Sequence, residues 1–215
     1  MVPKPDWTEA ISHLRNADPV LAALIDRYEL CALMPDTDYF SSLSESIICQ
    51  QISSKAGESI VRRFRALFPG GQPTPEGVSN LDEASLRSAG LSPQKMRYLK
   101  DLARKCLDGT IDLARLDQLP EEEIARQLRT VKGVGEWTVT MFLIFALNRT
   151  DVLPVWDLGL RRAVQLAYGL EALPDRGKLV EIARPWHPYE TIATWYLWRS
   201  LENKKDPGRE GVKQP

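Results

Sequence analysis

Residues 128–140, LRTVKGVGEWTVT, decide the fold of this chain. A charged amphipathic segment, 121–129, leads into the turn Gly133–Gly135, and a strongly apolar segment, 137–147, follows it directly. Apolar residues at three- and four-residue spacing indicate a helix on each side, and the two glycines indicate a tight turn. The stretch therefore predicts two helices joined by a short hairpin.

This hairpin is a candidate phosphate site. Because glycine has no Cβ, Gly133 and Gly135 allow the backbone to bend sharply and to approach another surface closely. The second helix begins at the turn, and the unpaired N–H groups at a helix start attract anions. Backbone N–H groups suit a repeated anion such as DNA phosphate, which carries no sequence information. The alternative is an ordinary turn between two helices, in which the glycines serve packing.

Composition limits the class of protein. The chain has 215 residues, enough to bury a full core in one large or two small domains. It is 43% apolar and 27% charged, which is typical of a globular protein. The formal charge of −1 argues against a protein that coats nucleic acid. Basic clusters could still form a local basic face, or simply solvated helix faces: Arg62, Arg63 and Arg65; Lys95, Arg97, Lys100, Arg104 and Lys105; Arg161 and Arg162.

Several classes are disfavoured. No apolar run reaches membrane-spanning length and the first residues lack the apolar core of a signal peptide, so we expect a cytoplasmic protein with no membrane partner. Cys31, Cys49 and Cys106 are odd in number and widely spaced, which argues against disulfides and a thiolate metal site. Two histidines argue equally against a histidine metal centre.

A helical pattern covers nearly the whole chain, so we predict an all-α fold. The predicted helices are 7–16, 19–28, 39–49, 53–68, 81–89, 93–107, 121–129, 137–147, 158–168, 178–184 and 189–201. Residues 36–149 are predicted to form a central bundle that ends in the hairpin, and residues 1–35 with 150–202 a second helical subdomain. The polar tail, 203–215, is predicted to be flexible.

Asp157 is the candidate catalytic residue. It follows Pro154 and precedes an amphipathic helix, which is typical of a helix N-cap. A carboxylate at a helix N-terminus is favoured in its charged form by the helix dipole and the N–H groups. Such a carboxylate could stabilise a cationic sugar in a transition state, or orient a water against the anomeric carbon. The capping and the catalytic interpretations can both hold.

These motifs resemble the helix-hairpin-helix, Gly/Pro-then-Asp (HhH-GPD) superfamily of DNA base-excision glycosylases, and within it the 3-methyladenine DNA glycosylase II (AlkA) branch. The specific part is the hairpin with Trp137 after it and Asp157 twenty-two positions beyond Gly135. Further matching segments are 18–25, 46–53, 184–189 and 195–199, so that the likeness covers about residues 7 to 201. The family implies two helical subdomains with an active-site cleft between them.

The resemblance also implies roles for individual residues. Asp157 would be the catalytic carboxylate, and the backbone of Gly133, Val134 and Gly135 would bind DNA, with Lys132 as a phosphate contact. In this family, carbonyls of the hairpin often bind a monovalent cation, Na⁺ or K⁺, that bridges to the DNA. The matching carbonyls here are those of Arg129, Val131 and Val134. No other cofactor is expected.

Other positions match the base pocket and the loop that fills the gap left by a flipped nucleotide. Trp137, Met141 and Trp195 would line the pocket, although Trp137 and Trp195 could equally be core tryptophans. Gln50, Gln51 and Ser53 would contact DNA, with Gln51 as the wedge, although the two glutamines could instead cap helices. Relatives that nick the strand carry a lysine where this chain has Trp137, so simple hydrolysis is expected.

The resulting interpretation is a monofunctional enzyme that releases 3-methyladenine and 7-methylguanine from double-stranded DNA and leaves an abasic site. It is expected to act as a monomer, at the nucleoid of a bacterium or in the nucleus of a eukaryote. Three alternatives stay open: a glycosylase of the same fold for etheno or deaminated bases, a non-catalytic helix-hairpin-helix DNA-binding module, and an all-α scaffold that binds protein.

Overall fold

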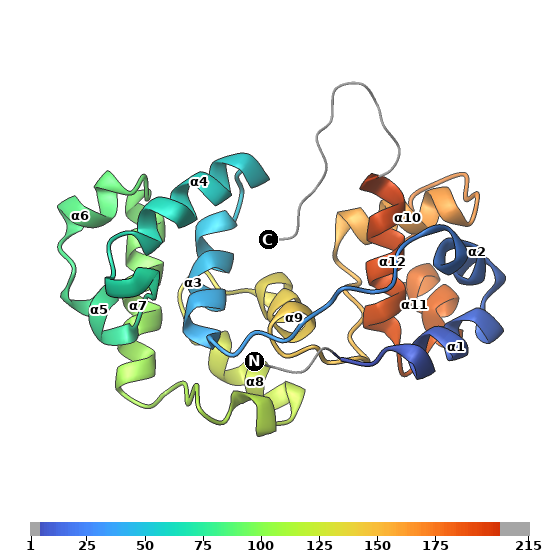
Figure 1. The fold of residues 1–215 in the computed structure, drawn as a ribbon, viewed down its shortest axis with the longest axis horizontal. Coiled ribbons are helices and arrows are strands. Elements are labelled where there is room, and N and C mark those ends of the chain that lie inside the picture. Colours follow the sequence, from blue (N-terminus) through green and yellow to red (C-terminus); the bar gives the residue numbers. More distant parts are fainter. Residues whose placement is uncertain (1–4, 203–215) are drawn as a thin grey trace. The chain divides into compact units, whose positions relative to one another are not determined.

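The structure, a computed structural model, describes residues 5–202. Within that range the chain forms helices joined by turns and no strand, so the predicted all-α fold is confirmed (Figure 1). The α-helices are α1 (Thr8–Ala17), α2 (Pro19–Arg27), α3 (Tyr39–Cys49), α4 (Ser54–Arg65), α5 (Pro75–Asn80), α6 (Glu83–Ser88), α7 (Pro93–Leu107), α8 (Glu121–Leu128), α9 (Glu136–Phe145), α10 (Leu158–Ala167), α11 (Arg176–Ala183) and α12 (Glu190–Glu202). Short 3-10 helices lie at Pro69–Gly71 (η1), Leu116–Gln118 (η2) and Arg184–Trp186 (η3).

The described residues fall into two compact units. Unit 1 contains residues 5–35 and 143–202, and unit 2 contains residues 36–142. The second boundary lies within α9, before Leu143, whereas the sequence placed it after Arg149. The flexible tail predicted at 203–215 lies outside the described residues.

Unit 2 is built around α7. This helix begins where the Ser92 hydroxyl accepts the Lys95 N–H and Pro93 occupies the first helical position, a combination that favours a helix start. α7 packs against α3, α5 and α6, and α3 packs against α4 (Figure 1). Leu99 and Leu102 of α7 are fully buried, and burying such side chains stabilises each by about 1.5–3 kcal/mol.

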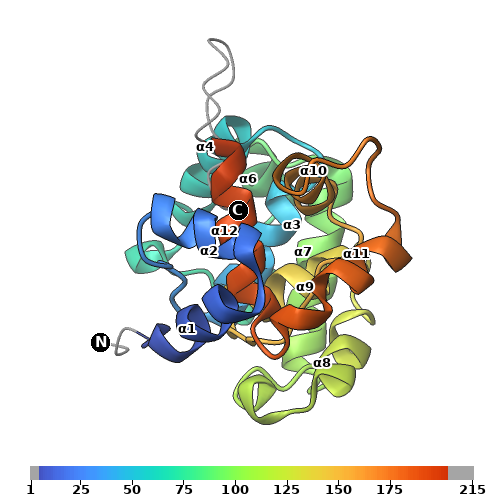
Figure 2. The same ribbon diagram turned by 90° about the vertical axis from the view of Figure 1, so that its right-hand side faces the viewer.

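Unit 1 is built around α12, which packs against α10, α2 and α1 (Figure 2). Asp18 is a second organising point, because its carboxylate caps α2 by accepting the N–H groups of Val20 and Leu21. The same carboxylate accepts hydrogen bonds from the Tyr168 hydroxyl and the Trp186 indole. One buried acid thus joins the start of α2 to the end of α10 and to η3.

Two helix predictions were wrong. Helix α5 was not predicted, because it is only six residues long and buries one apolar side chain, Val78. Its start signal is nevertheless present, since the Thr74 hydroxyl accepts the Gly77 N–H and Pro75 occupies the first helical position. The helix predicted over 53–68 ends at Arg65, and Phe68 lies beyond its end.

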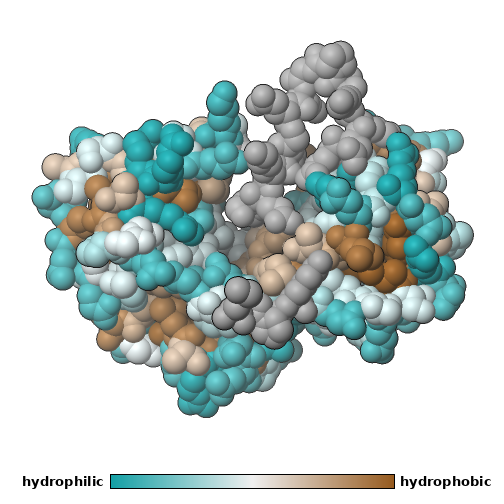
Figure 3. Space-filling model, viewed as in Figure 1, coloured by the Kyte–Doolittle hydropathy of each residue, from teal (hydrophilic) through white to brown (hydrophobic). Residues whose placement is uncertain are grey.

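On the face shown in Figure 3, hydrophilic residues cover most of each unit and smaller patches of apolar residues lie among them. Among residues 5–202, none of the helices combines the length and the apolar character that crossing a membrane requires.

Candidate functional site

The predicted hairpin is present in unit 2. Helix α8 ends at Leu128 and α9 begins at Glu136, with Gly133 in the left-handed region at φ +81°. The turn is held by backbone hydrogen bonds from the Val131 N–H to the Leu128 carbonyl, 3.0 Å, and from the Val134 N–H to the Val131 carbonyl, 3.1 Å. The two helices and the tight turn predicted from residues 128–140 are therefore confirmed.

Glycine is required at position 133 for two reasons: its φ lies in the left-handed region, and the Tyr98 ring approaches it closely. A Cβ at this position would lie 2.1 Å from Cε2 of Tyr98, a ring presented by α7. Gln94, one turn earlier on α7, donates to the Tyr98 hydroxyl at 2.5 Å. Gly135 has no atom within 4 Å of a Cβ at its own position. The two glycines thus differ: Gly133 lets the hairpin seat on α7, and Gly135 leaves an open backbone surface.

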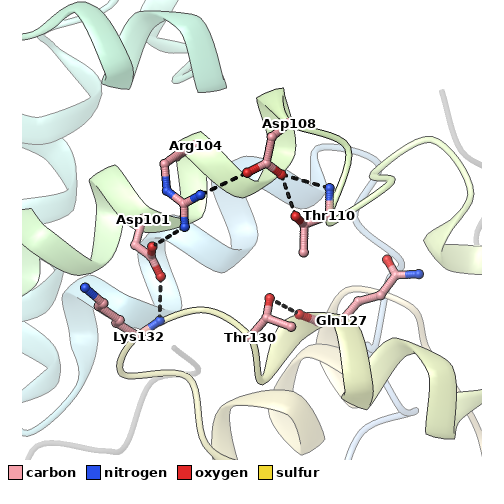
Figure 4. A network of polar contacts seen from close by, with 7 residues as sticks. All are labelled: Asp101, Arg104, Asp108, Thr110, Gln127, Thr130 and Lys132. Atoms are coloured by element: carbon pink, nitrogen blue, oxygen red, sulfur yellow. Dashed lines mark hydrogen bonds and ion pairs between the residues drawn. The ribbon is translucent and has the colours of Figure 1, made fainter.

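Asp101 of α7 anchors the hairpin through the Lys132 backbone (Figure 4). Its carboxylate, only 8% exposed, accepts the Lys132 N–H at 2.8 Å and a hydrogen bond from Arg104 at 3.0 Å. Arg104 also bonds Asp108 at 3.0 Å. Burial raises the pKa of the Asp101 carboxyl, but the hydrogen bonds from the Lys132 N–H and Arg104 outweigh burial and leave the pKa below its ordinary value.

This anchor could not be predicted from the sequence, since Asp101 lies within a helix that carries a cluster of basic residues. The Lys132 N–H is committed to Asp101, so the role predicted for Lys132 in phosphate binding rests on its exposed side chain. Arg129, which follows α8, forms an ion pair with the carboxylate of Glu136, the first residue of α9.

The loop after α3 contacts the hairpin through Gln50. Its side-chain Nε2 donates to the Gly133 carbonyl at 3.0 Å and to the Thr138 hydroxyl at 3.1 Å. Gln50, predicted to contact DNA, is therefore also a structural link between α3 and the hairpin. Gln51 is exposed and has a left-handed φ of +57°, a conformation uncommon outside glycine. Ser53 is the N-cap of α4, accepting the Ala56 N–H at 3.4 Å.

Asp157 lies in unit 1 as the N-cap of α10, so the predicted capping role is confirmed. Its Oδ1 accepts the Leu160 N–H at 2.6 Å and the indole N–H of Trp198, from α12, at 2.9 Å. The residue is half-buried rather than sealed in the core. A turn before it, in which the Asp157 N–H donates to the Pro154 carbonyl at 2.9 Å, sets the entry into the helix.

Thr191 holds the loop that leads to Asp157, a role that sequence reasoning missed. Its hydroxyl donates to the Arg149 carbonyl at 2.6 Å and accepts the Val152 N–H at 3.3 Å. Its backbone N–H donates to the Thr150 carbonyl at 2.9 Å. These bonds join the loop that leads to Asp157 to the first turn of α12, a helix whose residues 191–197 are buried. The position of Asp157 is therefore tied to the core of unit 1.

The predicted pocket residues differ in exposure. Trp137 is 40% exposed, at the start of α9, whereas Met141 and Trp195 are buried, at 3% and 4% exposed. Trp195 packs edge-on against Tyr196, and the Arg199 guanidinium lies 5.6 Å from the Trp195 ring centroid. The base-pocket roles of these residues stay predictions.

The predicted site residues therefore form two groups, each described within its own unit. Unit 2 contains the hairpin residues from Arg129 to Gly135, Trp137, Met141 and the loop residues Gln50, Gln51 and Ser53, of which Gln50 contacts the hairpin; unit 1 contains Asp157 and Trp195. A glycine hairpin between two helices in an all-helical chain, with an aspartate that caps a separate helix, matches a helix-hairpin-helix architecture.

Comparison with known proteins specifies the family. The protein-family model described as "HhH-GPD superfamily base excision DNA repair protein" matches residues 45–188, and the chain belongs to this family. It is 33% identical over 198 residues to DNA-3-methyladenine glycosylase 1 of Schizosaccharomyces pombe, covering 90% of this chain and 87% of the relative.

Solved structures give the same result. The S. pombe 3-methyladenine DNA glycosylase in complex with abasic DNA is similar with a TM-score of 0.81 at 32% identity, covering 91% of this chain and 97% of that one. The DNA-3-methyladenine glycosidase of Bacillus halodurans is similar with a TM-score of 0.77 at 32% identity, covering 94% and 92%.

Proposed function

We propose that the protein is a DNA-3-methyladenine glycosylase, which hydrolyses the N-glycosidic bond of alkylated purines, 3-methyladenine and 7-methylguanine, in double-stranded DNA. The observation that carries the proposal is Asp157, a half-buried carboxylate that accepts hydrogen bonds from the Leu160 N–H and the Trp198 indole, on a chain whose relatives bear this activity in their names. No feature of the described residues favours a different lesion or a non-catalytic role over this one.

The chemistry follows from the carboxylate. As the bond between C1′ and the base nitrogen breaks, its electron pair leaves with the base and positive charge develops on the sugar. Asp157 would stabilise that charge and orient the water that adds to C1′, and the proton lost by the water passes to solvent. A purine methylated at N3 or N7 is a good leaving group because its ring already carries a positive charge.

The reaction would end at hydrolysis. A glycosylase that also cuts the strand needs an amine nucleophile, which forms a Schiff base with the sugar. This chain has Trp137 at the position after Gly135 and Glu136 where such relatives carry lysine. An indole nitrogen is not a nucleophile, so the product would be an abasic site in an intact strand.

DNA would be held through its backbone by the hairpin, with the Lys132 side chain and the open surface at Gly135 facing phosphate. The carbonyls of Arg129, Val131 and Val134 would hold a monovalent cation, Na⁺ or K⁺, whose charge offsets that of the phosphate. Backbone carbonyl oxygens are the ligands that hard cations prefer. The Val131 carbonyl accepts one hydrogen bond at 3.1 Å, from the Val134 N–H, and keeps a second lone pair for a cation.

The damaged base would be flipped out and enclosed by aromatic and apolar side chains. Trp137 and Met141 of unit 2 and Trp195 of unit 1 are the candidates for contact with that base, and the electron-rich rings of the two tryptophans favour a cationic base. Gln51 would fill the gap left in the duplex, and its exposure together with its left-handed backbone suits a side chain that projects from a loop tip. As a repair enzyme, the protein would work as a monomer at the cell's DNA, in a bacterial cytoplasm or a eukaryotic nucleus.

The test is a product assay on duplex DNA treated with a methylating agent. Released bases are separated by chromatography, and the strand is examined on a denaturing gel before and after alkali. The proposal predicts release of 3-methyladenine and 7-methylguanine, with strand breaks only after alkali. Strand breaks before alkali would contradict the monofunctional mechanism. Release of etheno or deaminated bases alone would contradict the proposed substrate class, alkylated purines.

A further inference from the structure

Unit 1 contains the same hydrogen bond twice. The Trp198 indole donates to Asp157 at 2.9 Å, and the Trp186 indole donates to Asp18 at 2.9 Å. Both aspartates are helix N-caps, Asp157 for α10 and Asp18 for α2. They differ in accessibility, because Asp18 is only 6% exposed and Asp157 is half-buried. One bond therefore serves a cap in the core, and the other serves a cap that is only half-buried.

The Trp198 ring is itself held in place. Phe145, at the end of α9, stacks on it with the ring centroids 5.7 Å apart and the planes inclined by 17°. Trp198 lies on α12, which packs directly against α10, the helix that Asp157 caps. The stacking on Phe145 and the packing of α12 against α10 thus constrain the direction of the indole N–H.

The geometry around Asp157 fixes the whole carboxylate. The Leu160 N–H and the Trp198 N–H both end on Oδ1, at 2.6 and 2.9 Å. Two donors on one oxygen set the rotation of the carboxylate plane, and they hold the other oxygen in a single direction.

Gly159 allows this arrangement. A Cβ at residue 159 would lie 3.0 Å from the Asp157 Oδ1 and 3.5 Å from the Trp198 Nε1. A side chain there would press against the hydrogen bond between the indole and the carboxylate.

We propose that Trp198 is a positioning residue for catalysis, which orients the Asp157 carboxylate toward the sugar through its indole N–H. The inference rests on the proposed function, in which Asp157 is the catalytic carboxylate. A charged group acts on a transition state only when it is already aligned, because reorientation during the reaction adds to the barrier. Nothing in this role requires Trp198 to touch the DNA.

The direct test is Trp198→Phe, which keeps an aromatic ring to stack on Phe145 and removes the N–H donor. The single-turnover rate constant for release of 3-methyladenine should fall on the order of tenfold to hundredfold, the effect of losing one hydrogen bond to a charged group. Affinity for duplex DNA should not change, so the loss appears in the chemical step and not in binding.

Trp186→Phe is the matched control, because it removes the equivalent indole bond from Asp18. It should lower the thermal stability of the protein and leave the rate constant of the folded enzyme unchanged. Gly159→Ala is a second variant, in case Trp198→Phe folds poorly. Alanine favours a helix more than glycine does, so stability should be kept while the rate falls.

The outcomes separate the two proposals. A wild-type protein that releases no methylated base overturns the proposed function and this inference together. A wild-type protein that is active, with Trp198→Phe or Gly159→Ala equally active, overturns the inference alone. A rate loss in Trp186→Phe as large as that in Trp198→Phe would show that the effect is general destabilisation, and it would also overturn the inference.

Discussion

Replacing Gly133 with alanine should destabilise the protein through two separable effects. The first is backbone strain, because φ is +81° and a residue with a Cβ loses about 1–2 kcal/mol in the left-handed region. The second is overlap with Tyr98, whose Cε2 would lie 2.1 Å from the new Cβ, and overpacking of this kind costs about 1–3 kcal/mol. Together they predict a loss of about 2–5 kcal/mol in the free energy of unfolding.

A double-mutant cycle separates the two effects. In a Tyr98→Ala background the overlap disappears and only the backbone strain remains, so Gly133→Ala should cost about 1–2 kcal/mol there. The measurement is denaturant unfolding of the four proteins, followed by circular dichroism. Equal costs in the two backgrounds, or a cost near zero in the wild-type background, would refute the account of the hairpin seating on α7.

Gly135→Ala is the matched control, since its φ lies outside the left-handed region and no atom lies within 4 Å of the new Cβ. The free energy of unfolding should therefore change by no more than about 0.5 kcal/mol, as for an ordinary surface substitution. Binding to duplex DNA should nevertheless weaken, because the added methyl group stands where the backbone would approach phosphate.

Three further predictions concern single side chains. Asp101→Asn should lower the free energy of unfolding at pH 7. Because the pKa of the Asp101 carboxyl is depressed, its contribution to stability is lost as the pH falls, so the difference in free energy of unfolding between wild type and variant should shrink below pH 3.8. Equal differences at pH 7 and pH 3 in denaturant unfolding would contradict this. Lys132→Ala should reduce the slope of log affinity against log salt by about 1, measured by fluorescence anisotropy, and an unchanged slope would remove the phosphate contact. Asp18→Ala should cost about 2–4 kcal/mol in denaturant unfolding, because the Trp186 and Tyr168 donors lose their partner, and a smaller loss would contradict the capping role.

The sequence was most informative where local chemistry determines structure. The Gly133–Gly135 turn and the Asp157 cap were predicted because glycines between two amphipathic segments, and an aspartate before a third, are local signals. The same logic should have found α5, whose Thr74 cap and following proline were overlooked because the segment has almost no apolar periodicity.

Contacts between distant residues could not be predicted. Asp101 lies 31 positions from Lys132, and Trp198 lies 41 positions from Asp157. Nothing in the local pattern around Asp101 or Trp198 marks such a partner, since only the packing of α7 against the hairpin and of α12 against α10 creates it. Gln50 shows the same effect, because tertiary structure gives a residue predicted to bind DNA a second role in holding the hairpin.

Comparison of wild type with Asp157→Asn on methylated duplex DNA is the decisive measurement of whether the Asp157 carboxylate drives base release. Asparagine keeps an oxygen that can accept the Leu160 and Trp198 N–H groups, so the fold and DNA affinity should persist. Release of 3-methyladenine should be abolished in Asp157→Asn, while binding to duplex DNA is retained. Base release by Asp157→Asn at the wild-type rate would contradict it.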